Sequence, residues 1–178
     1  KQLSAYDDIW EKTDLVYICF DTYNDDQNAF CFGVSSVGVK EDGKFSGGNN
    51  YDVSYNPAWE VKTKINSKGW AAEYKIPLSA IRFPKTEIQT WGINCIRKVR
   101  RTRQMFTCPF FDQKNSSIVG QYANLTGINN IEPPLRLSFT PYISAYAQNY
   151  SDPANKINVP SKFFKGGMDL KWGMNESY

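Results

Sequence analysis

The fold follows from residues 59–76, WEVKTKINSKGWAAEYKI, which predict one antiparallel hairpin in one register. Turn formers (Asn, Ser, Lys, Gly) occupy positions 66–69, so residues 59–65 fold back against residues 70–76. The apolar face then carries Trp59, Val61, Thr63 and Ile65 opposite Ile76, Tyr74, Ala72 and Trp70. On the other face Glu60 lies opposite Lys75, and Lys62 lies opposite Glu73. Such charge pairs stabilise by roughly 0.2–1 kcal/mol each, and a one-residue slip would expose both tryptophans.

The segment after this hairpin changes its period. Pro77 suits the first position of a helical turn, so residues 77–81 predict one short turn. Pro84 ends the segment, and a new strand is expected from Trp91 onward.

Three motifs in order carry a family resemblance: GWAAEYKIPLSAIRFP (69–84), WGINCIRKVRR (91–101) and YANLTGINNIEPP (122–134). Residues 10–146 resemble the carbohydrate-binding module family 9 domain of Bacteroidetes-type outer-membrane proteins. In those proteins the module precedes a conserved region of unassigned function that is predicted to form an outer-membrane β-barrel.

The resemblance implies an all-β fold in two parts. Residues 1–132 are expected to form an antiparallel β-sandwich that lacks the N-terminal strands of the module, with residues 1–14 as a loop leading into the first strand. Residues 133–178 are expected to begin the C-terminal region with its first barrel strands. A place in the cell envelope is also implied, at the periplasmic or extracellular face of the outer membrane.

Composition agrees with one domain that has a hydrophobic core, since 41% of the 178 residues are hydrophobic and 15% are aromatic. The net charge is only +3, so no global field favours nucleic acid as a partner. The sequence contains no histidine, which excludes histidine triads and histidine metal sites.

Residues 15–20 and 29–34 predict a second hairpin. Pairing Phe20 with Phe30 places Cys19 opposite Cys31 and Tyr17 opposite Gly33. Both faces of this hairpin are apolar, so we expect it at the centre of a sheet. Residues 37–45 predict a further hairpin, with Asp42-Gly43 as its turn.

The loop 21–28 is rich in oxygen ligands. Asp21, Asn24, Asp25 and Asp26 are therefore a candidate calcium site, although their spacing is not that of an EF-hand. The alternative is a solvated acidic turn.

The four cysteines allow two cross-strand bridges in an oxidising compartment, Cys19–Cys31 and Cys95–Cys108. The alternative is four free cysteines that serve as small core residues.

Glycan binding needs flat aromatic rings beside amides and carboxylates. The loop before the first hairpin has this inventory, and we predict Tyr55 and Trp59 as stacking residues. Asn49, Asn50 and Asp52 are the predicted partners of the sugar hydroxyls. Trp70 and Trp91 lie inside regular strands and are predicted to be core residues.

Residues 97–103, RKVRRTR, are the densest charge in the chain. They predict either a solvated strand end or a contact with acidic sugars or outer-membrane phosphates.

The C-terminal residues alternate in polarity. Leu135, Leu137, Phe139, Ile143 and Ala145 alternate with polar residues that begin at Arg136, and Met168, Leu170, Trp172 and Met174 do so around Asp169 and Lys171. This is the repeat of transmembrane barrel strands, and two further strands of a soluble sandwich are the alternative.

Three functions remain open. The first is a non-catalytic carbohydrate-binding module of an envelope or secreted protein, with an oligo- or polysaccharide as its partner. The second is a structural or docking domain of an outer-membrane export or uptake assembly, with no sugar site. The third is a glycoside hydrolase, for which no carboxylate pair with a supporting motif is present.

Overall fold

The computed structural model describes residues 13–134, 137–152 and 157–172. Residues 1–12 of the predicted loop over residues 1–14 lie outside these ranges, as do Leu135, Arg136 and Met174 of the predicted C-terminal alternation. The chain divides into two compact units, residues 1–134 and 135–178. Both are built from antiparallel strands, so the chain is all-β, as predicted.

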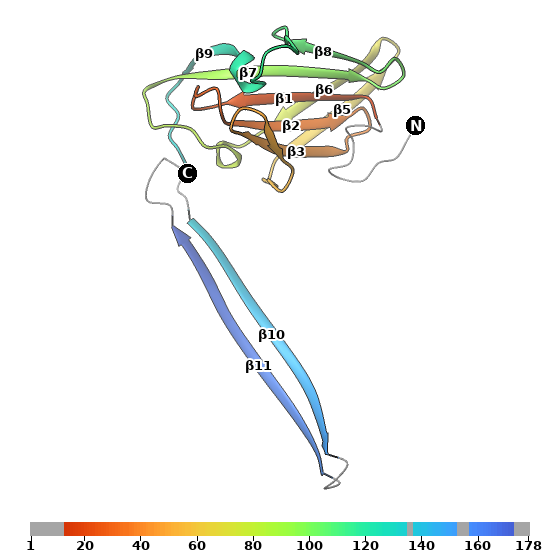
Figure 1. The fold of residues 1–178 in the computed structure, drawn as a ribbon, viewed down its shortest axis with the longest axis vertical. Helices are drawn as coiled ribbons and strands as arrows, with labels where there is room; N and C mark the ends of the chain where they lie inside the picture. The colour runs from red at the N-terminus through yellow and green to blue at the C-terminus, as the bar shows by residue number, and fades with distance from the viewer. Residues whose placement is uncertain (1–12, 135–136, 153–156, 173–178) are drawn as a thin grey trace. The chain divides into compact units, whose positions relative to one another are not determined.

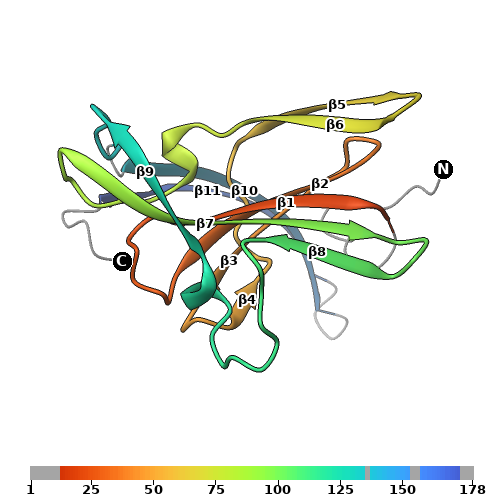
Figure 2. The ribbon, with the colours of Figure 1, turned by 90° about the horizontal axis from the view of Figure 1, so that it is seen from above.

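The first unit is organised around a seven-stranded sheet of order β4-β3-β2-β1-β7-β8, with β9 also paired to β7 (Figures 1 and 2). Its strands are β1 (Leu15–Asp21), β2 (Ala29–Ser35), β3 (Lys40–Ser46), β4 (Asn50–Asp52), β7 (Ile88–Val99), β8 (Gln104–Cys108) and β9 (Ala123–Asn129). Strand β8 pairs with the C-terminal part of β7, and β9 pairs with its N-terminal part. The two short strands therefore share one edge of the long one.

Strands β1 and β2 lie at the centre of this sheet in the predicted register. Phe20 pairs with Phe30, Cys19 with Cys31 and Tyr17 with Gly33. Every residue of β2 is buried. Apolar residues on both faces of this hairpin thus predicted its central position correctly.

The hairpin of β5 (Glu60–Asn66) and β6 (Gly69–Lys75) forms a two-stranded sheet of its own, in the predicted register. Trp59 stacks on Tyr74 with ring centroids 5.8 Å apart and meets Phe32 of the large sheet edge-on at 5.3 Å. The hairpin thereby covers one face of the large sheet, which gives a β-sandwich-like fold. Its apolar face is not buried throughout, because Ile65 near the tip is 61% exposed.

The short turn after β6 is the 3₁₀-helix η1 (Leu78–Ala80), which begins after Pro77 as predicted. The segment that follows it contributes Ile81 and Phe83 to the same core as Trp59 and Trp91. A second 3₁₀-helix, η2 (Val119–Gln121), precedes β9.

The predicted hairpin over residues 37–45 is wrong. Asp42 and Gly43 lie in the middle of strand β3 instead of forming a turn. Glycine is needed at position 43 because the ring of Tyr51 lies over it and would overlap a Cβ atom. Asp42 is buried and accepts a hydrogen bond from the indole N–H of Trp59 at 2.9 Å.

The second unit consists of the antiparallel strands β10 (Leu137–Asp152) and β11 (Ile157–Trp172). Their register is unbroken from the Leu137–Trp172 pair to the Asp152–Ile157 pair. Among the described residues of the whole chain, no helix combines the length and the apolar character needed to cross a membrane.

Candidate functional site

Trp59, a predicted sugar-stacking residue, is a core residue. Its side chain is 5% exposed and its indole Nε1 donates to Asp42. The ammonium group of Lys40 lies 5.0 Å from the ring centroid and donates to the Trp59 carbonyl at 3.0 Å. The ring faces are occupied by protein groups, so this structure leaves no face open to a sugar.

Tyr55, the other predicted stacking residue, also packs inward. Its hydroxyl donates to the carbonyl of Ala80, and its ring centroid lies 5.3 Å from that of Phe30. Burial raises the pKa of Tyr55 to about 12, although Arg82 opposes this shift. Tyr55 therefore closes the core beneath η1.

Asn49, Asn50 and Asp52, the predicted hydroxyl partners, lie together at strand β4. The side chain of Asn49 ties down the segment before η2, since it donates to the Ser116 carbonyl and accepts from the Ile118 N–H at 2.9 Å. Asp52 accepts the backbone N–H of Ser54 at 2.9 Å, and hydrogen bonds from the Ser54 hydroxyl and backbone lower the pKa of its carboxyl. Asn49 and Asp52 therefore use their side chains to hold neighbouring backbone segments.

The carboxylates of the predicted calcium loop are engaged in shaping the loop. Asp21 is buried and accepts the N–H groups of Tyr23 at 3.2 Å and Asp26 at 2.9 Å. Burial raises the pKa of Asp21, and these backbone hydrogen bonds oppose that effect. Asp25 caps the end of the loop by accepting the N–H groups of residues 27 and 28, each at 2.8 Å.

Calcium binding at Asp21, Asn24, Asp25 and Asp26 remains a prediction. Within the described ranges, no group of three or more acidic or cysteine side chains is arranged to hold a metal ion.

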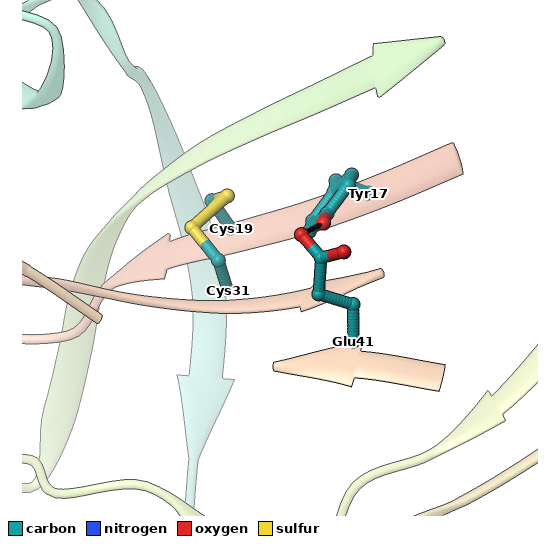
Figure 3. The surroundings of a disulfide bond; sticks show 4 residues. All are labelled: Tyr17, Cys19, Cys31 and Glu41. Atoms are coloured by element: carbon teal, nitrogen blue, oxygen red, sulfur yellow. Dashed lines mark hydrogen bonds between the residues drawn. A yellow bond between two sulfur atoms is a disulfide. The ribbon is translucent and has the colours of Figure 1, made fainter. Parts of the chain in front are cut away.

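The Cys19–Cys31 disulfide is present and joins the two central strands (Figure 3). Beside it, the hydroxyl of Tyr17 donates to the carboxylate of Glu41 across strand β2 (Figure 3). Gly33 makes this crossing possible, because the Tyr17 ring lies where a Cβ at position 33 would be. The sequence offered this disulfide as one of two alternatives, the other being free cysteines, and it gave no sign of the Tyr17–Glu41 hydrogen bond.

Cys95 and Cys108 lie directly opposite each other on β7 and β8, as predicted, but both are free thiols in this structure. Cys108 is exposed and Cys95 is partly buried. Burial, and then the neighbouring Cys108, raises the pKa of Cys95.

The β10–β11 hairpin has one apolar face, whose large side chains are exposed. Residues directly opposite in an antiparallel pair share a face, so the register places Phe139 with Leu170, Pro141 with Met168 and Ala145 with Phe164 on one side. The large apolar side chains of this face are exposed: Phe139 57%, Ile143 88%, Phe164 79%, Met168 66% and Leu170 64%. We call these five residues the apolar face.

The opposite face of this hairpin is mainly polar. It carries Thr140, Ser144 and Gln148 on β10, and Lys165 and Asp169 on β11. Tyrosines accompany them, and the ring of Tyr142 lies over Gly167, where a Cβ would overlap it. The alternation in the sequence identified residues 137–145 and 168–172, but it missed the first half of β11, including Phe164. Gly166-Gly167 and nearby lysines interrupt the pattern there.

Comparison with known families gives one match. Residues 133–178 are similar to a family described as a domain of unknown function (DUF5916). This agrees with the expected conserved region of unassigned function after residue 132, whereas no family match covers the sandwich. No curated protein and no solved structure matches the chain.

Proposed function

We propose that this chain is part of a cell-envelope protein in which the β10–β11 hairpin enters the outer membrane and the β-sandwich serves as a structural or docking unit in the aqueous phase. The observation that carries the proposal is the apolar face, with five large side chains exposed along one side of a hairpin. A surface of this kind needs a cover, and lipid tails or protein can supply it.

Strand length supports the membrane as the cover. A tilted transmembrane β-strand needs about 9–11 residues, and β10 and β11 have 16 residues each. Alternation between an apolar face and a mainly polar face is the pattern of outer-membrane strands.

The backbone sets a further condition. Within the described residues β10 and β11 pair only with each other, so the outer edge of each strand carries unpaired N–H and C=O groups. Such groups cost several kcal/mol each in hydrocarbon. The hairpin therefore enters a bilayer together with further strands, from the same protein or from other copies.

Adjacent phenylalanines of β11 provide a matched test. Phe163 pairs with Tyr146 on the polar face, Phe164 pairs with Ala145 on the apolar face, and both rings are exposed. The full chain is refolded with neutral phosphatidylcholine vesicles, and flotation measures its association. A lysine on a lipid-facing position costs about 2–4 kcal/mol at mid-bilayer, so Phe164→Lys should lose association.

Phe163→Lys introduces the same charge on the other face and should float like the parent. Equal flotation of the two variants would count against the assignment of faces. If the parent stayed with the lipid-free fraction while its sandwich was folded, membrane entry would be ruled out in favour of two strands that pack on protein.

A further inference from the structure

Cationic side chains from two separate turns gather at one end of the sandwich. One turn is the β5–β6 tip, and the other joins β7 to β8; Figure 2 shows both at the same end. One side-chain contact links the two strands beside these turns: the guanidinium carbon of Arg97 on β7 lies 5.1 Å from the ring centroid of Trp70 on β6. The exposed cations at this end are Lys64, Lys68, Arg100, Arg101 and Arg103, which we call the basic end.

Within the described residues, none of these five side chains forms an ion pair, although the carboxylate of Asp14 lies at this end and accepts the backbone N–H of Arg100 at 2.7 Å. Arg97 itself is occupied, because it donates to the Leu15 carbonyl at 3.1 Å and pairs with Asp14 at 3.6 Å. Arg97 thereby shares the carboxylate that the structure places beside the five cations of the basic end. They are a local excess of positive charge in a chain whose net charge is only +3.

Acidic residues lie at the other end of the sheet. The loop after β1 carries Asp25 and Asp26, and Glu87 precedes β7, whose first residues pair with β9. The chain leaves the sandwich at this end, because Asn129 at the end of β9 is opposite Ile88 at the start of β7. The basic end is therefore the end of the sandwich that is remote from the connection to the second unit.

Apolar groups accompany the cations. Ile65 at the hairpin tip is 61% exposed, and Phe106 on β8 is 55% exposed. Phe106 is directly opposite Arg97 and so shares the face on which Trp70 lies. Sugar rings have apolar C–H faces that pack on such groups, while arginine and lysine pair with carboxylates.

We propose that the basic end binds an acidic polysaccharide, a chain of sugar rings that carry carboxylate groups. The inference rests on the proposed function, because it assumes a location in the cell envelope, where such polymers occur. A single-stranded nucleic acid would need successive open rings for its bases. Here Arg97 covers the Trp70 ring, which leaves Phe106 as the exposed ring beside it.

The test uses polygalacturonate as the acidic polymer and dextran as the neutral one. Binding of the full chain in non-ionic detergent is measured by calorimetry at low salt and again at high salt. We expect binding to polygalacturonate alone, with a steep loss at high salt because counterions are released. The quadruple variant Lys64→Gln, Lys68→Gln, Arg100→Gln and Arg101→Gln should bind about tenfold more weakly, because it loses four exposed charge contacts.

A matched control removes charge elsewhere. Lys114 lies in the exposed loop after β8, and Lys114→Gln should bind like the parent. Unchanged binding by the quadruple variant, or equal binding to dextran, would overturn the proposal. The same holds if the parent binds phosphatidylglycerol vesicles or single-stranded DNA through these residues and ignores polygalacturonate. Flotation on neutral vesicles is a separate readout, so failure here is distinguishable from failure of membrane entry.

Discussion

Gly33 determines how the face that carries the disulfide is packed. The Tyr17 ring lies over this residue and reaches Glu41, and Tyr51 lies over Gly43 in the same manner. In each case the missing side chain, and not φ, makes the room, because neither glycine has a positive φ. A glycine within a strand pattern signals a close approach, but it does not say which ring comes near.

We predict that Gly33→Ala destabilises the sandwich by about 1–3 kcal/mol, the usual cost of overpacking a closed core. The added methyl group would overlap the Tyr17 ring and displace its hydroxyl from Glu41. Urea denaturation of the parent and the variant measures the change in free energy of unfolding. In a Tyr17→Ala background the same substitution should cost far less, and an equal cost in both backgrounds would show that the ring is not the cause.

Cys95 and Cys108 should differ in reactivity. The pKa of Cys95 is raised, first by burial and then by Cys108, whereas Cys108 is exposed. Because the thiolate is the reactive form, iodoacetamide should modify Cys108 well before Cys95 in the native chain. Peptide mass spectrometry of samples quenched over time gives the order. After unfolding without reductant both should be modified and Cys19 and Cys31 should not; four modified cysteines would contradict the disulfide.

At the scale of the elements, register was predicted best where two independent patterns agreed. In residues 59–76 the apolar face and the charge pairs required the same alignment, and the structure has it. In β1 and β2 the match of Phe20 with Phe30 fixed every other pair. The failure over residues 37–45 has the opposite cause, since one local signal, Asp42-Gly43, was outweighed by pairing of β3 with β2 and β4.

Substitutions on the apolar face of residues 59–65 should destabilise the protein in proportion to how deeply the replaced side chain is buried. Trp59 is 5% exposed and contacts Phe32 and Tyr74, so Trp59→Ala should cost about 3–5 kcal/mol. Ile65 belongs to the same face but is 61% exposed, and Ile65→Ala should stay within about 0.5 kcal/mol of the parent. Thermal unfolding followed by near-ultraviolet circular dichroism compares them. If Trp59→Ala were as stable as the parent, the Trp59 ring would not be a core residue.

At the scale of the whole molecule, the sequence predicted the fold better than the site. Periodicity reports which residues are buried, so it located the sandwich core and the apolar face of β10. Periodicity did not predict that the β5–β6 tip and the β7–β8 turn lie at the same end of the sandwich, because that placement depends on how the two sheets pack. Aromatic residues before the hairpin matched a glycan site in type, yet Trp59 and Tyr55 are used by the core.

Buried tyrosines make the sandwich sensitive to alkali. Burial raises the pKa of Tyr55 from 10.0 to about 12, and it raises those of Tyr74 and Tyr122 further. The native state therefore keeps protons that the unfolded chain has already lost. Stability depends on pH through the difference in bound protons, so this contribution is fully present below pH 10 and is lost as the pH rises toward the native pKa values.

We expect the free energy of unfolding to be level up to about pH 9 and then to fall, by about 1.4 kcal/mol per pH unit for each such tyrosine within its window. Urea titrations between pH 8 and pH 11 measure this slope. Tyr55→Phe should start about 0.5–1.5 kcal/mol lower, because its hydroxyl donates to Ala80, but it should fall less steeply above pH 10. Lysines titrate in the same range, but they are common to both proteins and cancel in the comparison. A parent slope in Tyr55→Phe would mean that this hydroxyl ionises as freely in the folded chain as in the unfolded one.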